Sequence, residues 1–160
     1  GAGSGFITEA LLKANASVIA IDQSPVMLDT LRERFPGVET RTGEAENLPL
    51  DDASVDYAFA NMFLHHVERP AETIKDMART LKPGGKLIIT DLDEHDYEFL
   101  RTEQHDRWLG FKREDVAQWF QDAGLRQVSV DCIDGESCCS DSACGTEKAE
   151  VSIFIAYGEK

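Results

Sequence analysis

Basic residues are scarce in this chain. Its 160 residues contain 16 lysines and arginines against 30 aspartates and glutamates, which gives a formal net charge of −14 at pH 7. A protein that holds the phosphate backbone of nucleic acid, or an anionic membrane surface, needs charge of the opposite sign. We therefore expect neither nucleic acid nor a membrane as a partner of this domain.

Long hydrophobic runs are also absent. No stretch approaches the roughly 20 apolar residues of a membrane-spanning helix, and no signal peptide is visible. We expect a cytoplasmic, reducing location, where disulfides are not the default for the four cysteines. The sequence also lacks a pair of cysteines separated by two residues, the spacing that is typical of zinc sites.

No strand precedes the glycine-rich start GAGSG, which opens directly into a helical pattern over residues 6–14. Glycine lets backbone N–H groups approach a ligand closely. The helix N-terminus behind the loop offers free N–H groups and the positive end of a dipole. Because a nucleotide loop of this kind needs an anchoring strand, we expect the natural protein to continue upstream of residue 1, where a targeting segment or a whole domain could lie.

Helical and strand patterns alternate along residues 1–91. Helices are expected over 6–14, 24–35 and 74–81, and strands over 18–21, 38–42, 55–60 and 86–91. This alternation predicts an α/β fold with a doubly wound, mostly parallel sheet, which binds ligands at the carboxyl ends of its strands. Five features fall at such ends, namely the glycine loop, Asp22, Glu44, Asn61 and Asp91.

Beyond Asp91 the pattern changes. Residues 93–109 are strongly polar and are expected to be helical, and a further helix over 116–123 is expected to end at Gly124. Strands are expected at 128–132 and 151–157, paired antiparallel because nothing helical lies between them. Cys132 falls on the apolar face of its strand and is expected in the core, and residues 134–149 are expected to form a cysteine-containing loop.

Four motifs resemble those of class I S-adenosylmethionine-dependent methyltransferases. They are GAGSG, AIDQSPVML, TGEAENLPLDDASVDYAFANMFLHHV and LKPGGKLIITD, in that family's order and spacing. The resemblance implies one methyltransferase domain over 1–160, with a Rossmann-like, seven-stranded sheet that ends in an antiparallel hairpin. Its first strand, central to the sheet, is absent from this chain. The segment HDYEFLRTEQHDRWLGF is similar to a subgroup often found behind a winged-helix repressor of the arsenic-sensing type, so an upstream regulatory domain is a candidate partner.

The resemblance also implies a binding site for S-adenosylmethionine. The glycine loop would lie near the methionine carboxylate, Asp22 would accept hydrogen bonds from both ribose hydroxyls, and Glu44 would accept one from the adenine amino group. Each of these features also has a purely structural explanation. The loop could be a tight turn, Asp22 could be an acid that the dipole favours at a helix N-terminus, and Met27 could pack in the core. The expected cofactor-binding residues are Gly1, Ala2, Gly3, Gly5, Asp22, Gln23, Met27, Gly43, Glu44, Ala45, Asn61 and His66.

Residues 93–111 are the expected lid over the methyl acceptor; the alternative is a solvated helix face with pairs such as Glu98 and Arg101. The first candidates for a catalytic role are His95, His105 and Arg101. The adjacent His65 and His66 titrate near neutral pH, but similar pairs in the family pack on the cofactor, so cofactor contact by His66 is favoured over a general base.

The sequence therefore predicts methyl transfer from S-adenosylmethionine to a small-molecule acceptor. One alternative is a thiol-mediated arsenite or metalloid methyltransferase, because thiolates suit soft metals and metalloids. Another is a non-catalytic module that senses the cofactor or a metal for an attached regulator. The candidate metal or metalloid ligands, which are equally consistent with incidental thiols, are Cys138, Cys139 and Cys144.

Overall fold

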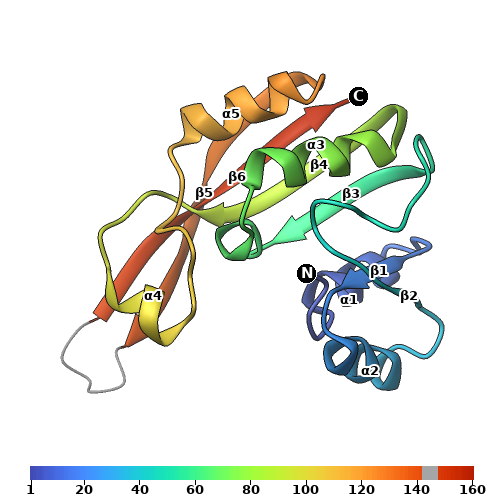
Figure 1. The fold of residues 1–160 in the computed structure, drawn as a ribbon, viewed down its shortest axis with the longest axis horizontal. Coiled ribbons are helices and arrows are strands. Elements are labelled where there is room, and N and C mark those ends of the chain that lie inside the picture. Colours follow the sequence, from blue (N-terminus) through green and yellow to red (C-terminus); the bar gives the residue numbers. More distant parts are fainter. Residues whose placement is uncertain (142–147) are drawn as a thin grey trace. The chain divides into compact units, whose positions relative to one another are not determined.

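The computed structural model describes residues 1–141 and 148–160 of the chain (Figure 1). The chain divides into two compact units, residues 1–51 and 52–160, and each is described by itself. No helix in the described part of the chain is both long and apolar enough to cross a membrane.

The first unit contains two helices and two strands in alternation. In chain order they are α1 (Phe6–Lys13), β1 (Ile19–Asp22), α2 (Pro25–Arg34) and β2 (Glu39–Thr42). The two strands pair in parallel, with Asp22 opposite Thr42. Helix α2 begins as the sequence indicates, because the Ser24 hydroxyl accepts a hydrogen bond from the Met27 amide and Pro25 occupies the first turn.

The apolar faces predicted for these two helices are only partly buried. Thr8 is the buried residue of α1, whereas Phe6 is 77% exposed. In α2, Leu28 and Leu31 are buried, but Met27 is 44% exposed, so core packing of Met27 is wrong. The unit's small sheet of two strands cannot cover every apolar side chain, and its core consists of Ala20, Leu31 and Val38, with Ala2, Leu12, Val18 and Phe35 packed against it.

The second unit builds a four-stranded mixed sheet. The strands lie in the order β3-β4-β6-β5, with β3 and β4 parallel and the pairs β4–β6 and β6–β5 antiparallel. The antiparallel C-terminal hairpin is therefore confirmed. The elements of this unit are β3 (Val55–Asn61), η1 (Leu64–His66), α3 (Pro70–Thr80), β4 (Leu81–Leu92), α4 (Phe99–Glu103), α5 (Arg113–Asp122), β5 (Arg126–Asp141) and β6 (Lys148–Glu159).

Helices α3 and α5 pack side by side over one face of this sheet (Figure 1). The close approach of α5 depends on Gly158 in β6, because a Cβ atom there would lie 2.9 Å from the Phe120 ring. Gly124 follows α5 with a φ of +81°, which confirms it as the C-terminal glycine of that helix. The buried core side chains include Ile74, Ala78, Leu87, Ile89, Val116, Phe120, Phe154 and Ala156.

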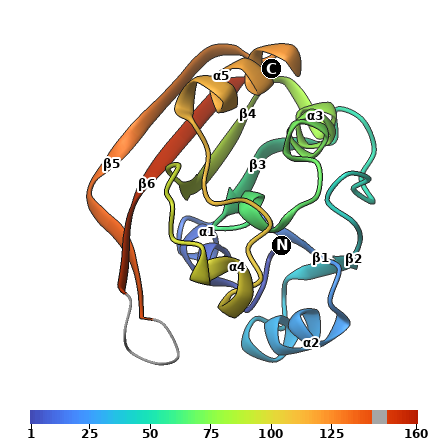
Figure 2. The ribbon, with the colours of Figure 1, turned by 60° about the vertical axis from the view of Figure 1, so that its left-hand side comes forward.

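Three expectations about the second half of the chain are wrong. Residues 93–109 are not one helix, because a bridge between Asp93 and Phe111 closes them into a loop that contains only the short α4. The expected loop over 134–149 is wrong for its described part, because β5 and β6 stay paired out to Asp141 and Lys148 (Figure 2), while residues 142–147 lie outside the described residues. Cys132 is exposed, since β5 is the edge strand and a register irregularity follows this residue.

Candidate functional site

The glycine loop lies against the carboxyl end of β1. The amide of Ala2 donates a 2.9 Å hydrogen bond to the carbonyl of Ile21. Gly3 and Gly5 have left-handed φ angles of +53° and +90°, and a Cβ atom on Gly5 would lie 2.8 Å from the Phe35 ring. Glycine is therefore required at position 5 both by the backbone conformation and by the packing.

Asp22, the last residue of β1, fastens this loop. One carboxylate oxygen accepts a 2.9 Å hydrogen bond from the amide of Gly3, and the other accepts a 2.9 Å bond from the amide of Ser24. The residue is only 7% exposed. Each carboxylate oxygen has more than one acceptor position, so the fixed carboxylate retains the capacity to accept from a ligand. The sequence indicated a ligand role for Asp22 but did not reveal that it also holds the loop.

The turn after β2 lies beside β1. The Gly43 amide donates to the Asp22 carbonyl at 3.1 Å, and a Cβ atom on Gly43 would clash with Cδ of Pro49. Glu44 follows in an exposed position and opens a short turn that closes at Asn47. The first unit therefore brings together the loop, Asp22 and Gly43, while the side chains of Gln23, Met27 and Glu44 are exposed.

In the second unit, Asn61 ends β3 and is tied to the neighbouring strand. Its side-chain oxygen accepts a 2.7 Å hydrogen bond from the Thr90 hydroxyl. The next residue, Met62, has a φ of +48°, and its amide donates to the Thr90 carbonyl at 2.9 Å. The chain therefore turns sharply at the carboxyl end of β3.

Asp91, near the end of β4, is fully buried and receives this turn. One carboxylate oxygen accepts from the amides of Phe63 and Leu64, at 3.1 and 2.7 Å. The other accepts from the amide of Leu92 at 2.8 Å and lies 2.6 Å from Nδ1 of His65. Asp91 lies near a strand end, as the sequence predicted, but its carboxylate is already engaged in hydrogen bonds with groups of the protein itself.

His65, His66 and Asp106 form a cluster beside Asp91. Nε2 of His65 lies 3.7 Å and Nδ1 of His66 lies 3.6 Å from the same carboxylate oxygen of Asp106. Burial alone would lower the pKa of His65, but the hydrogen bond to Asp91 and the charges of both aspartates outweigh it and raise that pKa. Burial and the charge of His65 lower the pKa of His66. No motif pointed to Asp106, which the loop brings to the histidines from far along the chain.

The comparisons with known proteins match this arrangement. Residues 1–89, which include the glycine loop, Asp22 and the histidine pair, fit the family model described as "Methyltransferase domain". The chain belongs to this methyltransferase domain family.

Two curated relatives of the methyltransferase domain are similar over about half of its length. An uncharacterized methyltransferase of Mycobacterium tuberculosis is 44% identical over 87 residues, which are 54% of this chain and 35% of that protein. The demethylmenaquinone methyltransferase of Paenarthrobacter aurescens is 36% identical over 90 residues, 56% of this chain and 36% of that protein. The chain thus spans about a third of the length of these relatives.

A solved structure shows the fold of the methyltransferase domain. Phosphoethanolamine N-methyltransferase 2 of Haemonchus contortus, in complex with S-adenosyl-L-methionine, superposes with a TM-score of 0.79 over 100% of this chain and 47% of that chain, at 16% identity. The architecture is the Rossmann-like α/β fold of class I methyltransferases, and the expected fold class is confirmed.

The three catalytic candidates of the methyltransferase domain are in different environments. Nδ1 of His95 accepts a 3.3 Å hydrogen bond from the Tyr97 amide, while its buried Nε2 has no hydrogen-bond partner among the described residues. Burial lowers the pKa of His95. His105 is exposed, with a φ of +61°. Arg101 pairs with Glu98 at 3.1 Å, as in the alternative of a solvated helix face.

An ion pair that the sequence did not indicate closes the base of the 93–111 segment. Both guanidinium edge nitrogens of Arg113 bond to the two oxygens of Asp93, at 2.7 and 2.6 Å, and the Ser152 hydroxyl donates to Asp93 at 2.6 Å. These bonds outweigh the effect of burial and lower the pKa of Asp93. They join the segment to α5 and β6.

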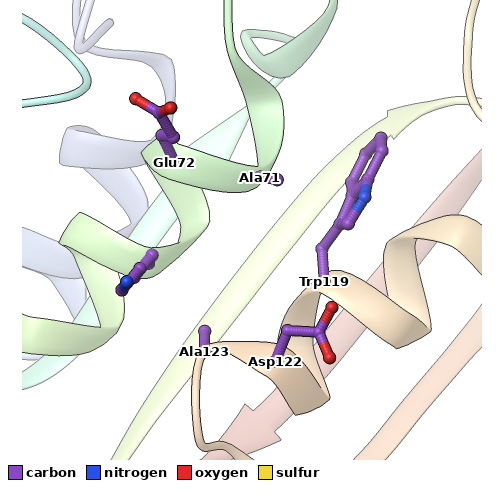
Figure 3. Close-up of a pocket in the computed structure, with 6 residues that line it drawn as sticks. Ala71, Glu72, Trp119, Asp122 and Ala123 are labelled. Atoms are coloured by element: carbon purple, nitrogen blue, oxygen red, sulfur yellow. The ribbon is translucent and has the colours of Figure 1, made fainter.

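A hollow of about 180 Å³ lies between α3 and α5 (Figure 3). The Trp119 side chain forms one wall, and no strand-end residue lines the hollow, so it is not a candidate for the cofactor site. Its lining residues are Ala71, Glu72, Lys75, Trp119, Asp122 and Ala123.

The three cysteines proposed as metal ligands lie largely outside the described part of the chain. The backbone of Cys138 pairs with Val151 and that of Cys139 with Glu150 in the hairpin. The side chains of these two cysteines, and all of Cys144, lie outside the described residues.

Proposed function

We propose that this domain binds S-adenosylmethionine and transfers its methyl group to a small-molecule acceptor. The observation that carries the proposal is the bond between Gly3 of the glycine loop and the strand-end carboxylate of Asp22. It supports a site in which backbone N–H groups and a fixed carboxylate lie together, next to the N-terminus of α1. Both groups are what the amino-acid and ribose parts of the cofactor require.

The residues of the first unit fit this cofactor. A Cβ atom on Gly3 would meet no atom within 4 Å among the described residues, so the loop backbone is accessible at that point. Asp22 is held by two amides and can accept from ribose hydroxyls through its remaining acceptor positions. The exposed Glu44 is available to accept from the adenine amino group. Contact of Asn61 and His66 with the cofactor stays a prediction.

The protein's part in the reaction is mainly alignment. When bound, S-adenosylmethionine supplies a methyl group on a sulfonium, which is already a good leaving group. The protein has to hold the acceptor in line with that group, and it needs a general base only if the acceptor must first lose a proton. A small acceptor is supported by the charge of −14, which disfavours polyanionic acceptors. The names of one curated relative and of one solved structure, which contain demethylmenaquinone and phosphoethanolamine respectively, give further support.

We assign the binding of the methyl acceptor, the acceptor side of the site, to residues 93–111. The Asp93–Arg113 pair fastens the base of this segment, and the amides of Arg107 and Trp108 both donate to the carbonyl of His65. His95 supplies a buried N–H that has no partner among the described residues. Burying a hydrogen-bond donor without a partner costs free energy. A hydrogen bond from this N–H to an oxygen of the bound methyl acceptor would relieve that cost.

The direct test is calorimetric titration of S-adenosylhomocysteine into the protein and into its Asp22→Ala variant. We expect micromolar binding that the variant loses by about 100-fold, the loss of two hydrogen bonds to a charged group. Asp29→Ala is the matched control, because it removes an exposed carboxylate of α2 that pairs with Arg32. A folded protein that does not bind would contradict the proposal.

Turnover separates an enzyme from a sensing module. Release of S-adenosylhomocysteine should be measured with panels of hydroxyl, amine and thiol acceptors. Product formation with one class supports methyl transfer. Cofactor binding without product from any class would favour the non-catalytic sensor attached to a regulator. Nothing in the described residues favours an arsenite acceptor.

A further inference from the structure

The cluster of His65, His66 and Asp106 has the spacing of a metal site. The three side chains offer one ligand atom each, and these atoms all lie within 4.8 Å of one another. The separations from the Asp106 oxygen, 3.7 Å to His65 Nε2 and 3.6 Å to His66 Nδ1, are too long for hydrogen bonds. Ligand atoms of a tetrahedral ion with bonds of about 2.0–2.2 Å lie roughly 3.4 Å apart. The two separations from the Asp106 oxygen are therefore within about 0.3 Å of those in a tetrahedral site.

The orientation of His65 is suited to a metal ligand. An ionised carboxylate only accepts hydrogen bonds, so the 2.6 Å contact assigns the proton of the neutral His65 ring to Nδ1. The lone pair of the neutral ring is then on Nε2, the atom that faces Asp106. A ligating histidine commonly donates its other N–H to a carboxylate in this way. Asp91 is itself fixed by amides of η1, so the ring cannot turn away.

The second histidine lies against the first. The centroid of the His66 ring lies 4.0 Å from that of His65, and Nδ1 of His66 lies 3.6 Å from the Asp106 carboxylate. The His66 side chain is 43% exposed, whereas those of His65 and Asp106 are 6% and 4% exposed. Two of the three side chains are thus buried, and the third is partly exposed to solvent.

We propose that His65, His66 and Asp106 bind a divalent transition-metal ion, with Zn²⁺ as the best match, and leave a fourth position for water or another small ligand. Two imidazoles and one carboxylate suit zinc, whereas Mg²⁺ and Ca²⁺ prefer oxygen ligands throughout. Three protein ligands with one open position is the arrangement of reactive rather than purely structural zinc sites.

The bound ion would also join two segments of the second unit. His65 and His66 belong to η1, which follows β3, and Asp106 belongs to the segment over which the acceptor side was assigned. The amides of Arg107 and Trp108 already bond to the His65 carbonyl, at 3.0 and 3.1 Å. The site therefore rests on a preformed contact. Neither the glycine loop nor Asp22 supplies a ligand, so the test of the ion site does not depend on cofactor binding, although His66 is also an expected cofactor contact and Asp106 lies in the segment assigned to the acceptor.

The experiment is titration of Zn²⁺ into chelator-treated protein, followed by calorimetry, with Co²⁺ as the spectroscopic probe. Thiolates also bind Zn²⁺ and Co²⁺, so the background is the variant in which all four cysteines, Cys132, Cys138, Cys139 and Cys144, are replaced by serine. We expect one ion per chain, visible d–d bands of tetrahedral Co²⁺ without a thiolate charge-transfer band, and a melting temperature raised by Zn²⁺.

Two ligand variants and one control decide the assignment. Asp106→Asn and His66→Ala should each weaken Zn²⁺ binding by at least tenfold and abolish the tetrahedral Co²⁺ bands. Asp96→Asn, which alters an exposed acid of the same segment, should leave both unchanged. Circular dichroism of each variant establishes that it is folded. Absence of binding in the cysteine-free background, or binding that both ligand variants retain, would overturn the proposal.

Discussion

Nδ1 of the buried His65 lies 2.6 Å from Oδ1 of the fully buried Asp91, and this contact joins the turn after β3 to the end of β4. The other oxygen of the same carboxylate accepts hydrogen bonds from two backbone N–H groups at the start of η1. A buried charge is tolerated when it is paired and hydrogen-bonded in this way. Asp91 therefore determines where the histidines lie.

Replacing Asp91 by asparagine should cost about 3–5 kcal/mol, because breaking a buried pair leaves the partner uncompensated and the amide nitrogen cannot accept. Urea unfolding measures this cost. The matched control is Asp76→Asn, which alters a carboxylate of α3 beside Arg79 and should cost about 1 kcal/mol. A cost below about 1 kcal/mol for the Asp91 variant would mean that the pair does not hold the turn.

The conformation of Gly5 gives a second prediction. Gly5→Ala should destabilise the fold by about 1–3 kcal/mol, because φ is +90° and the new methyl group would lie 2.8 Å from the Phe35 ring. Gly37→Ala is the matched control, since nothing among the described residues lies within 4 Å and its φ is not positive. Thermal unfolding of both variants tests the difference, and an equal effect would refute the argument.

The elements of the first 91 residues were predictable because local chemistry determines them. Ser24 and Pro25 specify the start of α2, and the apolar run that ends at Asp22 specifies β1. The loop around Asp93–Phe111 was not predictable, since its conformation depends on the pairing of Asp93 with Arg113 and Ser152, which are distant in sequence. Cys132 was misplaced because strand alternation predicts a face only while the register is regular.

The residues of the candidate site also fall into two groups, those that could be predicted from the sequence and those that could not. The glycine loop, Asp22 and Gly43 could be read from motifs, because each is a residue type that a strand end requires. Asp106 could not be identified from a motif, because a single aspartate in a polar segment resembles its neighbours Asp96 and Glu103. Only the fold brings it to His65, which precedes it by 41 residues.

The Asp93–Arg113 pair predicts a pH dependence of stability. The folded-state pKa of Asp93 lies below its ordinary value of 3.8, so the pair stabilises the fold above that value, and the contribution is lost as pH falls through the folded pKa. Asp93→Asn should therefore cost about 1–3 kcal/mol at neutral pH. At an acid pH below the folded pKa, where the native carboxyl is also protonated, the cost should be much smaller. Urea unfolding of both proteins at the two pH values measures this, and a cost independent of pH would show that packing, not charge, is responsible.

The last prediction concerns the proton on His95. Because Nδ1 accepts from the Tyr97 amide, the neutral ring carries its proton on Nε2, the buried atom without a partner among the described residues. If Nε2–H donates to the methyl acceptor, His95→Gln, whose amide reaches close to the Nε2 position, should retain more activity than His95→Asn. His95→Asn can keep the contact to Tyr97 but not the distal donor, so we expect it to preserve thermal stability and to lose about tenfold in kcat/KM, the worth of one hydrogen bond. His105→Asn, at an exposed position of the same segment, is the comparison. Equal activity of the two His95 variants would exclude a donor role for Nε2 and leave His95 as a structural residue of the loop.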